Sequence, residues 1–171
     1  NLVRKLSGLQ TLEFNTWKQT VDPSFEGITM HNLTSLTIAG RHWQQHHLAE
    51  VLRACSPSLR RLDISVNCVK YALEAFVVPS LQNLCSLTSH YLTDAALYAI
   101  SNVCVHLTHL DMVCCDSCTD DGVLSVVRSL KLRSLGIPCT AHITNTTIRN
   151  IILYLADTLH VFCVNHEIHT A

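Results

Sequence analysis

The stretch LTHLDMVCCDSCTDDGVLSVV, residues 107–127, carries the pattern that decides the fold. Its first six residues follow the form L-x-x-L-x-φ, in which φ is apolar, so that apolar Leu110 and Met112 alternate with polar neighbours. Such alternation predicts a strand that buries one face. Thr119 then stands just before apolar residues at helical spacing, as a helix-capping residue does. These residues therefore predict one short strand followed by one helix.

The same unit recurs along the whole chain. Its strand pattern starts at leucines spaced 22 to 27 residues apart: Leu9, Leu33, Leu59, Leu81, Leu107, Leu132 and Leu159. This period lies within the range of leucine-rich repeats that carry a helix on the outer side. The fourth unit, LQNLCS from Leu81, is the weakest, because Ser86 stands where a core residue is expected. We therefore expect a bend or a local gap in that strand.

Helices are predicted after most of these strands. Thr93, Thr119 and Thr144 each precede apolar residues at spacings of three and four, and similar stretches begin at His47 and Lys70. The helix after Thr144 has an apolar stripe that should face the sheet, formed by Ile148, Ile151, Ile152 and Leu155.

Stacking of these units predicts the fold class. One strand, turn and helix cannot bury its own apolar face, so neighbouring units must share a core, with parallel strands on one side. Helices are wider than the spacing between strands, so the stack must curve with the strands inside. We therefore predict an α/β fold, a leucine-rich-repeat solenoid shaped as a horseshoe arc, with about seven strand–helix repeats, a concave parallel sheet and convex helices. Residues 1–171 form one domain in this interpretation, a fragment of a longer repeat array, since the last unit stops soon after its strand.

Several cysteine and threonine positions are typical of one class of repeat. Cys115 stands at the turn after its strand, where that class has Cys or Asn. Thr-Asp starts helices at Thr93 and Thr119, while Cys55 and Cys104 close helices just before the next unit. In these features nearly the whole chain resembles the cysteine-containing leucine-rich repeats of F-box proteins. The resemblance implies a protein–protein interaction module, the substrate-recognition repeat region of an F-box-like ubiquitin ligase receptor.

The partner implied by this resemblance is a protein substrate. A ubiquitin-ligase adaptor would bind an F-box segment, which has no counterpart among these residues. The alternative function is that of a non-enzymatic scaffold, or of an immune-type receptor repeat region, without a ubiquitin role. An upstream F-box would favour the first function, and an upstream nucleotide-binding module would favour the second.

Composition narrows the remaining classes of function. Lys and Arg number 12 against 13 Asp and Glu, so the chain lacks the basic surplus with which proteins neutralise nucleic acid. No apolar stretch approaches the roughly 20 residues needed to span a bilayer, so no membrane span is expected. The nine cysteines show no small-scaffold spacing and are interpreted as reduced thiols, which predicts a cytoplasmic or nuclear location.

Two clusters could supply metal ligands. Cys114, Cys115 and Cys118 would bind zinc if a fourth ligand came close, but no second CxxC or paired-His motif completes such a site. His42 and His46 are spaced as two ligands on one helical face would be, yet no acidic residue accompanies them. With nine Cys and eleven His in the chain, a catalytic Cys–His pair can always be postulated and carries little information. We therefore predict no enzymatic activity, no metal and no cofactor.

The concave face of the predicted sheet is the candidate binding surface. Strand residues that alternate with the buried leucines should point outward there. In its middle, charges of both signs lie beside an exposed leucine, a combination that suits a protein or peptide partner. The candidate partner-binding residues are Arg61, Asp63, Asn83, Cys85, Leu87, His109 and Asp111. The alternative is that these residues only keep the sheet soluble.

Overall fold

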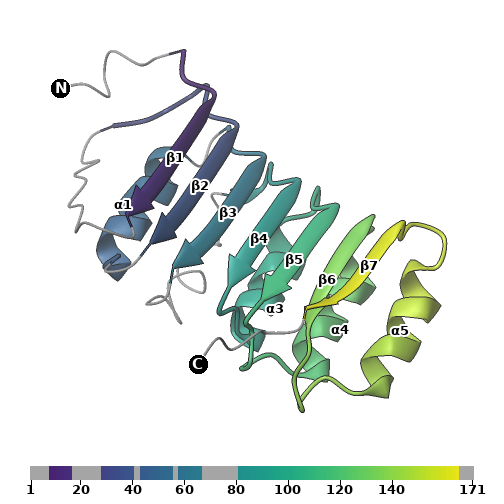
Figure 1. Cartoon of the computed structure of the whole chain (residues 1–171). Coiled ribbons are helices and arrows are strands. Elements are labelled where there is room, and N and C mark those ends of the chain that lie inside the picture. The colour runs from purple at the N-terminus through teal and green to yellow at the C-terminus, as the bar shows by residue number, and fades with distance from the viewer. Residues whose placement is uncertain (1–7, 17–27, 41–42, 56–57, 67–80, 166–171) are drawn as a thin grey trace.

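The computed structural model describes residues 8–16, 28–40, 43–55, 58–66 and 81–165 (Figure 1). This part of the chain contains seven strands and four helices. Their bounds are, in chain order, β1 Thr11–Thr16, β2 Ser35–Gly40, α1 Gln45–Cys55, β3 Arg61–Val66, β4 Ser86–His90, α3 Asp94–Val103, β5 His109–Val113, α4 Asp120–Ser129, β6 Ser134–Pro138, α5 Asn145–Leu155 and β7 Val161–Asn165.

The strands form one parallel sheet, in which their order is the order of the chain, from β1 to β7. The described helices lie on one face of this sheet, and no described helix covers the opposite face (Figure 1). We call the uncovered side the open face. The predicted α/β class with a single parallel sheet is therefore confirmed.

The core lies between the sheet and the helices. From β2 to β6, the second and fourth residues of each strand point into it and are at most 2% exposed: Leu36, Ile38, Leu62, Ile64, Leu87, Ser89, Leu110, Met112, Leu135 and Ile137. These side chains lie in register from strand to strand, so each unit adds one layer to a shared core. Because side chains alternate along a strand, the residues between these core positions point to the other side and form the open face.

The helix starts form a ladder of hydrogen bonds between successive units. Thr93, Thr119 and Thr144 are the N-caps of α3, α4 and α5, as predicted. Asp94 accepts hydrogen bonds from the backbone N–H and hydroxyl of Thr119, at 2.8 and 2.7 Å, and Asp120 does the same for Thr144. The caps of α4 and α5 are thus held by the first residue of the preceding helix, which fixes the spacing of these neighbouring helices.

The predicted register of the fourth unit is wrong. Leu87 pairs with Leu62 of β3 and with Leu110 of β5, so the unit begins at Leu84 rather than at Leu81. Leu87 is 1% exposed and belongs to the core, whereas it was expected on the open face. The expected bend or gap at Ser86 is also absent from this strand, because Ser86 lies in line with exposed positions of β3 and β5.

Two further predictions on the helical side are corrected or resolved. Ile152 is 64% exposed, so the buried stripe of α5 consists of Thr147, Ile151 and Leu155, with Ile148 half-buried. The helix start at His47 is confirmed within α1, while the stretch from Lys70 and the side chain of His42 lie outside the described residues.

The last strand of the sheet lacks part of this cover. Phe162 and Val164 of β7 pair in register with Leu135 and Ile137, yet they are 41% and 50% exposed. No described strand or helix follows β7 to enclose them. Separately, none of the helices in the described ranges is long and apolar enough to cross a membrane.

Candidate binding surface on the open face

The open face is built from the odd-numbered positions of the strands. The first residues of the strands align across the sheet as one row, Thr11, Ser35, Arg61, Ser86, His109, Ser134 and Val161. The third residues align as a second row, Glu13, Thr37, Asp63, Thr88, Asp111, Gly136 and Cys163. Apart from Glu13 of β1, the ionisable acidic and basic side chains in these rows lie on β3 and β5, at the middle of the sheet.

Four of the predicted binding residues lie together on this face. Arg61 and His109 are exposed in the first row, and Asp63 and Asp111 are half-buried in the second. They occupy β3 and β5, which are separated only by β4. The cationic Arg61 and the two aspartates, beside the imidazole of His109, give the open face a fixed pattern of polar groups.

The other three predicted binding residues do not lie on the open face of β4. Leu87 is in the core, Cys85 directly precedes the strand, and Asn83 is exposed in the turn before it. The carbonyl oxygen of Cys85 accepts backbone hydrogen bonds from Thr108 and His109, so Cys85 serves the sheet ladder. The register error explains all three placements, because a slip of three residues leaves Asn83 and Cys85 ahead of the strand and turns Leu87 to the core side of the sheet.

The true open-face residues of β4 are Ser86, Thr88 and His90. Burial raises the pKa of Asp63, the facing His90 lowers it, and the negative charge of Asp111 raises it, with a net upward shift. The Nε2 atom of His90 also lies 3.3 Å from the hydroxyl of Ser65 on β3. His90 therefore joins Arg61, Asp63, His109 and Asp111 in a cluster that we call the charged centre. The sequence pattern missed His90 because the unit was placed three residues too early.

A second missed feature joins strands that are not neighbours. The side-chain amide of Asn165 on β7 donates a hydrogen bond of 2.6 Å to Asp111 Oδ1 on β5, and one of 2.9 Å to the carbonyl of Met112. Between them lies Gly136 of β6, where an added Cβ would stand 2.0 Å from Asp111 Oδ1. The absence of a side chain at Gly136 thus lets the two groups meet. A glycine inside a strand is a sign of such a close approach.

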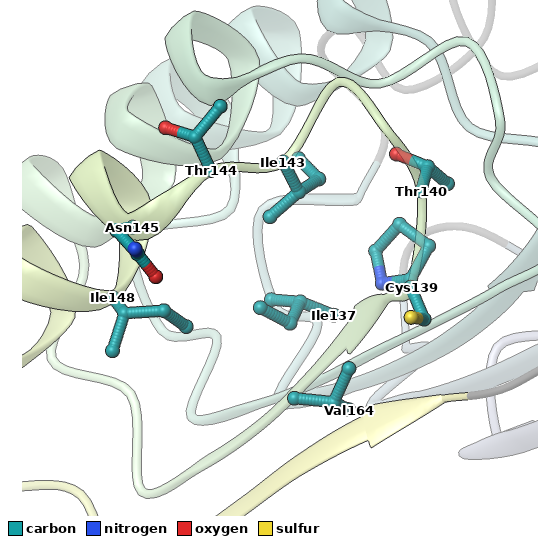
Figure 2. A pocket seen from close by; sticks show the side chains of 9 residues that line it. Ile137, Cys139, Thr140, Ile143, Thr144, Asn145, Ile148 and Val164 are labelled. Atoms are coloured by element: carbon teal, nitrogen blue, oxygen red, sulfur yellow. The ribbon is translucent and has the colours of Figure 1, made fainter.

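Two hollows border the sheet. One, of about 340 Å³, is lined by polar side chains at the start of the strands, including Arg60, Thr34 and the predicted Asn83. The other, of about 370 Å³, lies beside α5 and the end of β7 and is lined largely by Ile137, Ile143, Ile148 and Val164 (Figure 2). The apolar hollow opens next to the incompletely covered side of β7, so it belongs to the edge of the core rather than to the charged centre.

Three of the residues considered as metal ligands, Cys115, Cys118 and His46, are engaged in packing or hydrogen bonds. Within the described ranges, no group of three or more His, Cys, Asp or Glu side chains is placed to hold a metal ion. Cys115 and Cys118 are buried and bind the backbone of Leu92, while the rings of His46 and His47 lie 3.9 Å apart.

Trp43, which follows β2, packs against the first unit. It is 5% exposed, and its indole N–H donates a hydrogen bond of 3.0 Å to the hydroxyl of Thr16. Its ring also packs edge-on against Phe14, with 5.5 Å between the ring centroids. Trp43 is therefore a packing residue that joins the first two units.

No protein-family model matches the sequence, and no curated protein matches it.

Proposed function

We propose that the chain is a leucine-rich-repeat solenoid that binds another protein through the open face. The strand–helix units, 23 to 27 residues in length once the fourth unit starts at Leu84, and the placement of the described helices on one side of the sheet support the repeat assignment. A stacked sheet of this kind presents an extended surface on which repeat proteins bind partners.

The observation that carries the proposal is the charged centre of the open face. It consists of Arg61, Asp63, His90, His109 and Asp111 on three adjacent strands. The backbone of the sheet fixes the position of every one of these residues, and the hydrogen bond from Asn165 restrains Asp111 further. Charges restrained in this way favour one orientation of a partner, and they lose little conformational freedom when it binds.

We further propose that the partner is a protein to be ubiquitinated, and that these repeats are the substrate-recognition region of an F-box-like receptor. The support is the resemblance of the repeats, including Cys115 in the turn after β5, whose sulfur accepts a hydrogen bond from the N–H of Leu92. A ligase adaptor would bind an F-box segment, so the repeats themselves would contact only the substrate.

The experiment compares two variants with identical changes in residue type and charge. Arg61→Glu/His109→Glu alters the open face, and Arg149→Glu/His142→Glu alters exposed residues of α5 and the loop before it. Each protein is used to capture partners from cell lysate, after circular dichroism and urea unfolding have verified its fold. We expect a partner recovered with the wild type and the α5 variant to be lost with the open-face variant.

Recovery of the same partners with all three proteins would refute the open-face proposal. The ubiquitin link is tested separately with the identified partner, whose ubiquitination should rise when the parent protein is expressed and fall with Arg61→Glu/His109→Glu. If binding depends on the open face but ubiquitination never changes, the chain acts as a scaffold without a ubiquitin role.

A further inference from the structure

A tight turn between β5 and α4 contains two buried cysteines. The backbone N–H of Cys118 donates a hydrogen bond of 3.0 Å to the carbonyl of Cys115, which closes the turn. Both side chains are fully buried, whereas Asp116 and Ser117 between them are exposed. The ends of such a turn lie within about 7 Å of each other, close to the range of Cα separations that a disulfide requires.

The two sulfur atoms bind the backbone of one residue, Leu92. Cys115 Sγ accepts a hydrogen bond of 3.2 Å from the N–H of Leu92, and Cys118 Sγ donates one of 3.2 Å to the carbonyl of the same residue. Cys115 Sγ also lies 3.2 Å from the carbonyl oxygen of Val113. Across the turn, both side chains are therefore directed toward the same residue, Leu92.

The environments of the two thiols differ in a way that favours exchange. The neighbouring Cys118 thiol lowers the pKa of Cys115, burial raises it, the backbone at Leu92 and Tyr91 lowers it, and the charge of Asp116 raises it, with a net downward shift. The neighbouring Cys115 thiol, together with burial, raises the pKa of Cys118. Cys115 is thus the better thiolate of the pair, and the thiolate is the form that attacks a disulfide.

Other buried cysteines provide a contrast within the same fold. Burial raises the pKa of Cys55 and of Cys104 to about 12, without a neighbouring thiol to offset it. These thiols stay protonated, and they lie at the C-terminal ends of α1 and α3 rather than in a turn that begins and ends with a cysteine. Local opening of a surface turn requires far less free energy than global unfolding.

We propose that Cys115 and Cys118 form a redox-modification site that is oxidised to an intramolecular disulfide by low-molecular-weight disulfides such as oxidised glutathione. The Cys115 thiolate attacks one sulfur of oxidised glutathione, forms a mixed disulfide and releases the first glutathione thiolate. Cys118 loses its proton to water and attacks the Cys115 sulfur, which releases the second glutathione. In total, two protein thiols are oxidised and one glutathione disulfide is reduced to two thiols.

The test uses the full chain in native buffer with oxidised glutathione. The reaction is stopped with acid, free thiols are alkylated, and the protein is digested with a protease that cleaves before aspartate. This protease separates Asp111–Cys115 from Asp116–Thr119, so a disulfide appears as a covalent link between these two fragments. A first alkylation is performed before the protein is unfolded. We expect the linked pair to form, while Cys55 and Cys104 are recovered reduced and protected from this first alkylation.

Matched variants assign the link to one pair of sulfurs. Cys115→Ser and Cys118→Ser should abolish it, whereas Cys114→Ser should retain it, although Cys114 is in the same fragment as Cys115. Loss of the link in Cys114→Ser would overturn the proposal, and this variant decides the matter even if Cys115→Ser does not fold. Formation of the link only after Cys55 and Cys104 become alkylated would also overturn it, because oxidation would then follow unfolding.

Discussion

Replacement of Leu87 by alanine tests the register of the fourth unit. The Leu87 side chain is 1% exposed and lies in the core row between Leu62 and Leu110. Truncation of a buried leucine to alanine costs about 2 to 5 kcal/mol, the upper part of that range applying where the surroundings do not collapse into the cavity. Packed strands on both sides of Leu87 restrict such collapse, so we expect a loss of about 3 kcal/mol.

The assay is urea unfolding followed by circular dichroism. With a slope of about 2 kcal/mol/M, a loss of this size lowers the urea midpoint by about 1.5 M. Ser86→Leu is the matched control, because Ser86 is half-buried on the open face and no core gap is available for a larger side chain. A neutral effect of Leu87→Ala together with stabilisation by Ser86→Leu would refute the register, since that outcome requires Ser86 in the core.

Three further predictions concern hydrogen bonds between units. Gly136→Ala should displace Asp111, break its 2.6 Å hydrogen bond from Asn165 and lower the free energy of unfolding in urea by about 1 kcal/mol. In an Asn165→Ala background this loss should vanish. If the losses of the two single variants simply add in the double variant, the contact is contradicted. Thr119→Ala should lower the free energy of unfolding by about 1 kcal/mol, because the Thr119 hydroxyl caps α4 and donates a hydrogen bond to Asp94. Thr119→Ser retains the hydroxyl and should keep most of this stability. Equal losses in both variants would argue against the capping role. Burial raises the pKa of Asp120, but hydrogen bonds from Thr144 and Thr147 outweigh this effect and produce a net lowering. The stability that Asp120 contributes to the folded state is therefore present above about pH 4 and is lost as the pH falls through the folded-state pKa. Asp120→Asn should therefore flatten the acid side of the curve of stability against pH, and an unchanged curve would show that these bonds do not affect folding.

Local signals predicted most of the fold. Thr93, Thr119 and Thr144 could be recognised as helix caps because the capping hydroxyl and the apolar spacing lie within one short segment. The strand pattern placed Arg61 and Asp63 on the open face for the same reason. These assignments depend on period and residue type, which are visible in a single sequence.

The fourth unit could not be placed in this way. Leu81, Leu84 and Leu87 are spaced by three, so two overlapping L-x-x-L patterns compete within one segment. Only pairing with β3 and β5 distinguishes them, and that information comes from residues far along the chain. The error carried over to the candidate site, where Leu87 was included and His90 was omitted.

The contact between Asp111 and Asn165 could not be predicted from the sequence, for a related reason. Period-two alternation puts both residues on the open face, but β6 lies between their strands and normally keeps such side chains apart. The meeting depends on the missing Cβ of Gly136. Glycine within a strand signals that something comes close, without identifying which two groups do.

The bridge over Gly136 also bears on how the stack unfolds. In a one-dimensional array, each unit usually interacts only with the unit before and after it, so the units can fray one at a time from an end. The Asn165–Asp111 bond adds a coupling between next-nearest neighbours, because it joins β7 to β5 across β6. Detachment of β7 therefore releases a restraint on the charged centre two strands away, and hydrogen exchange at β5 and β7 should be more closely correlated than nearest-neighbour contacts alone would allow.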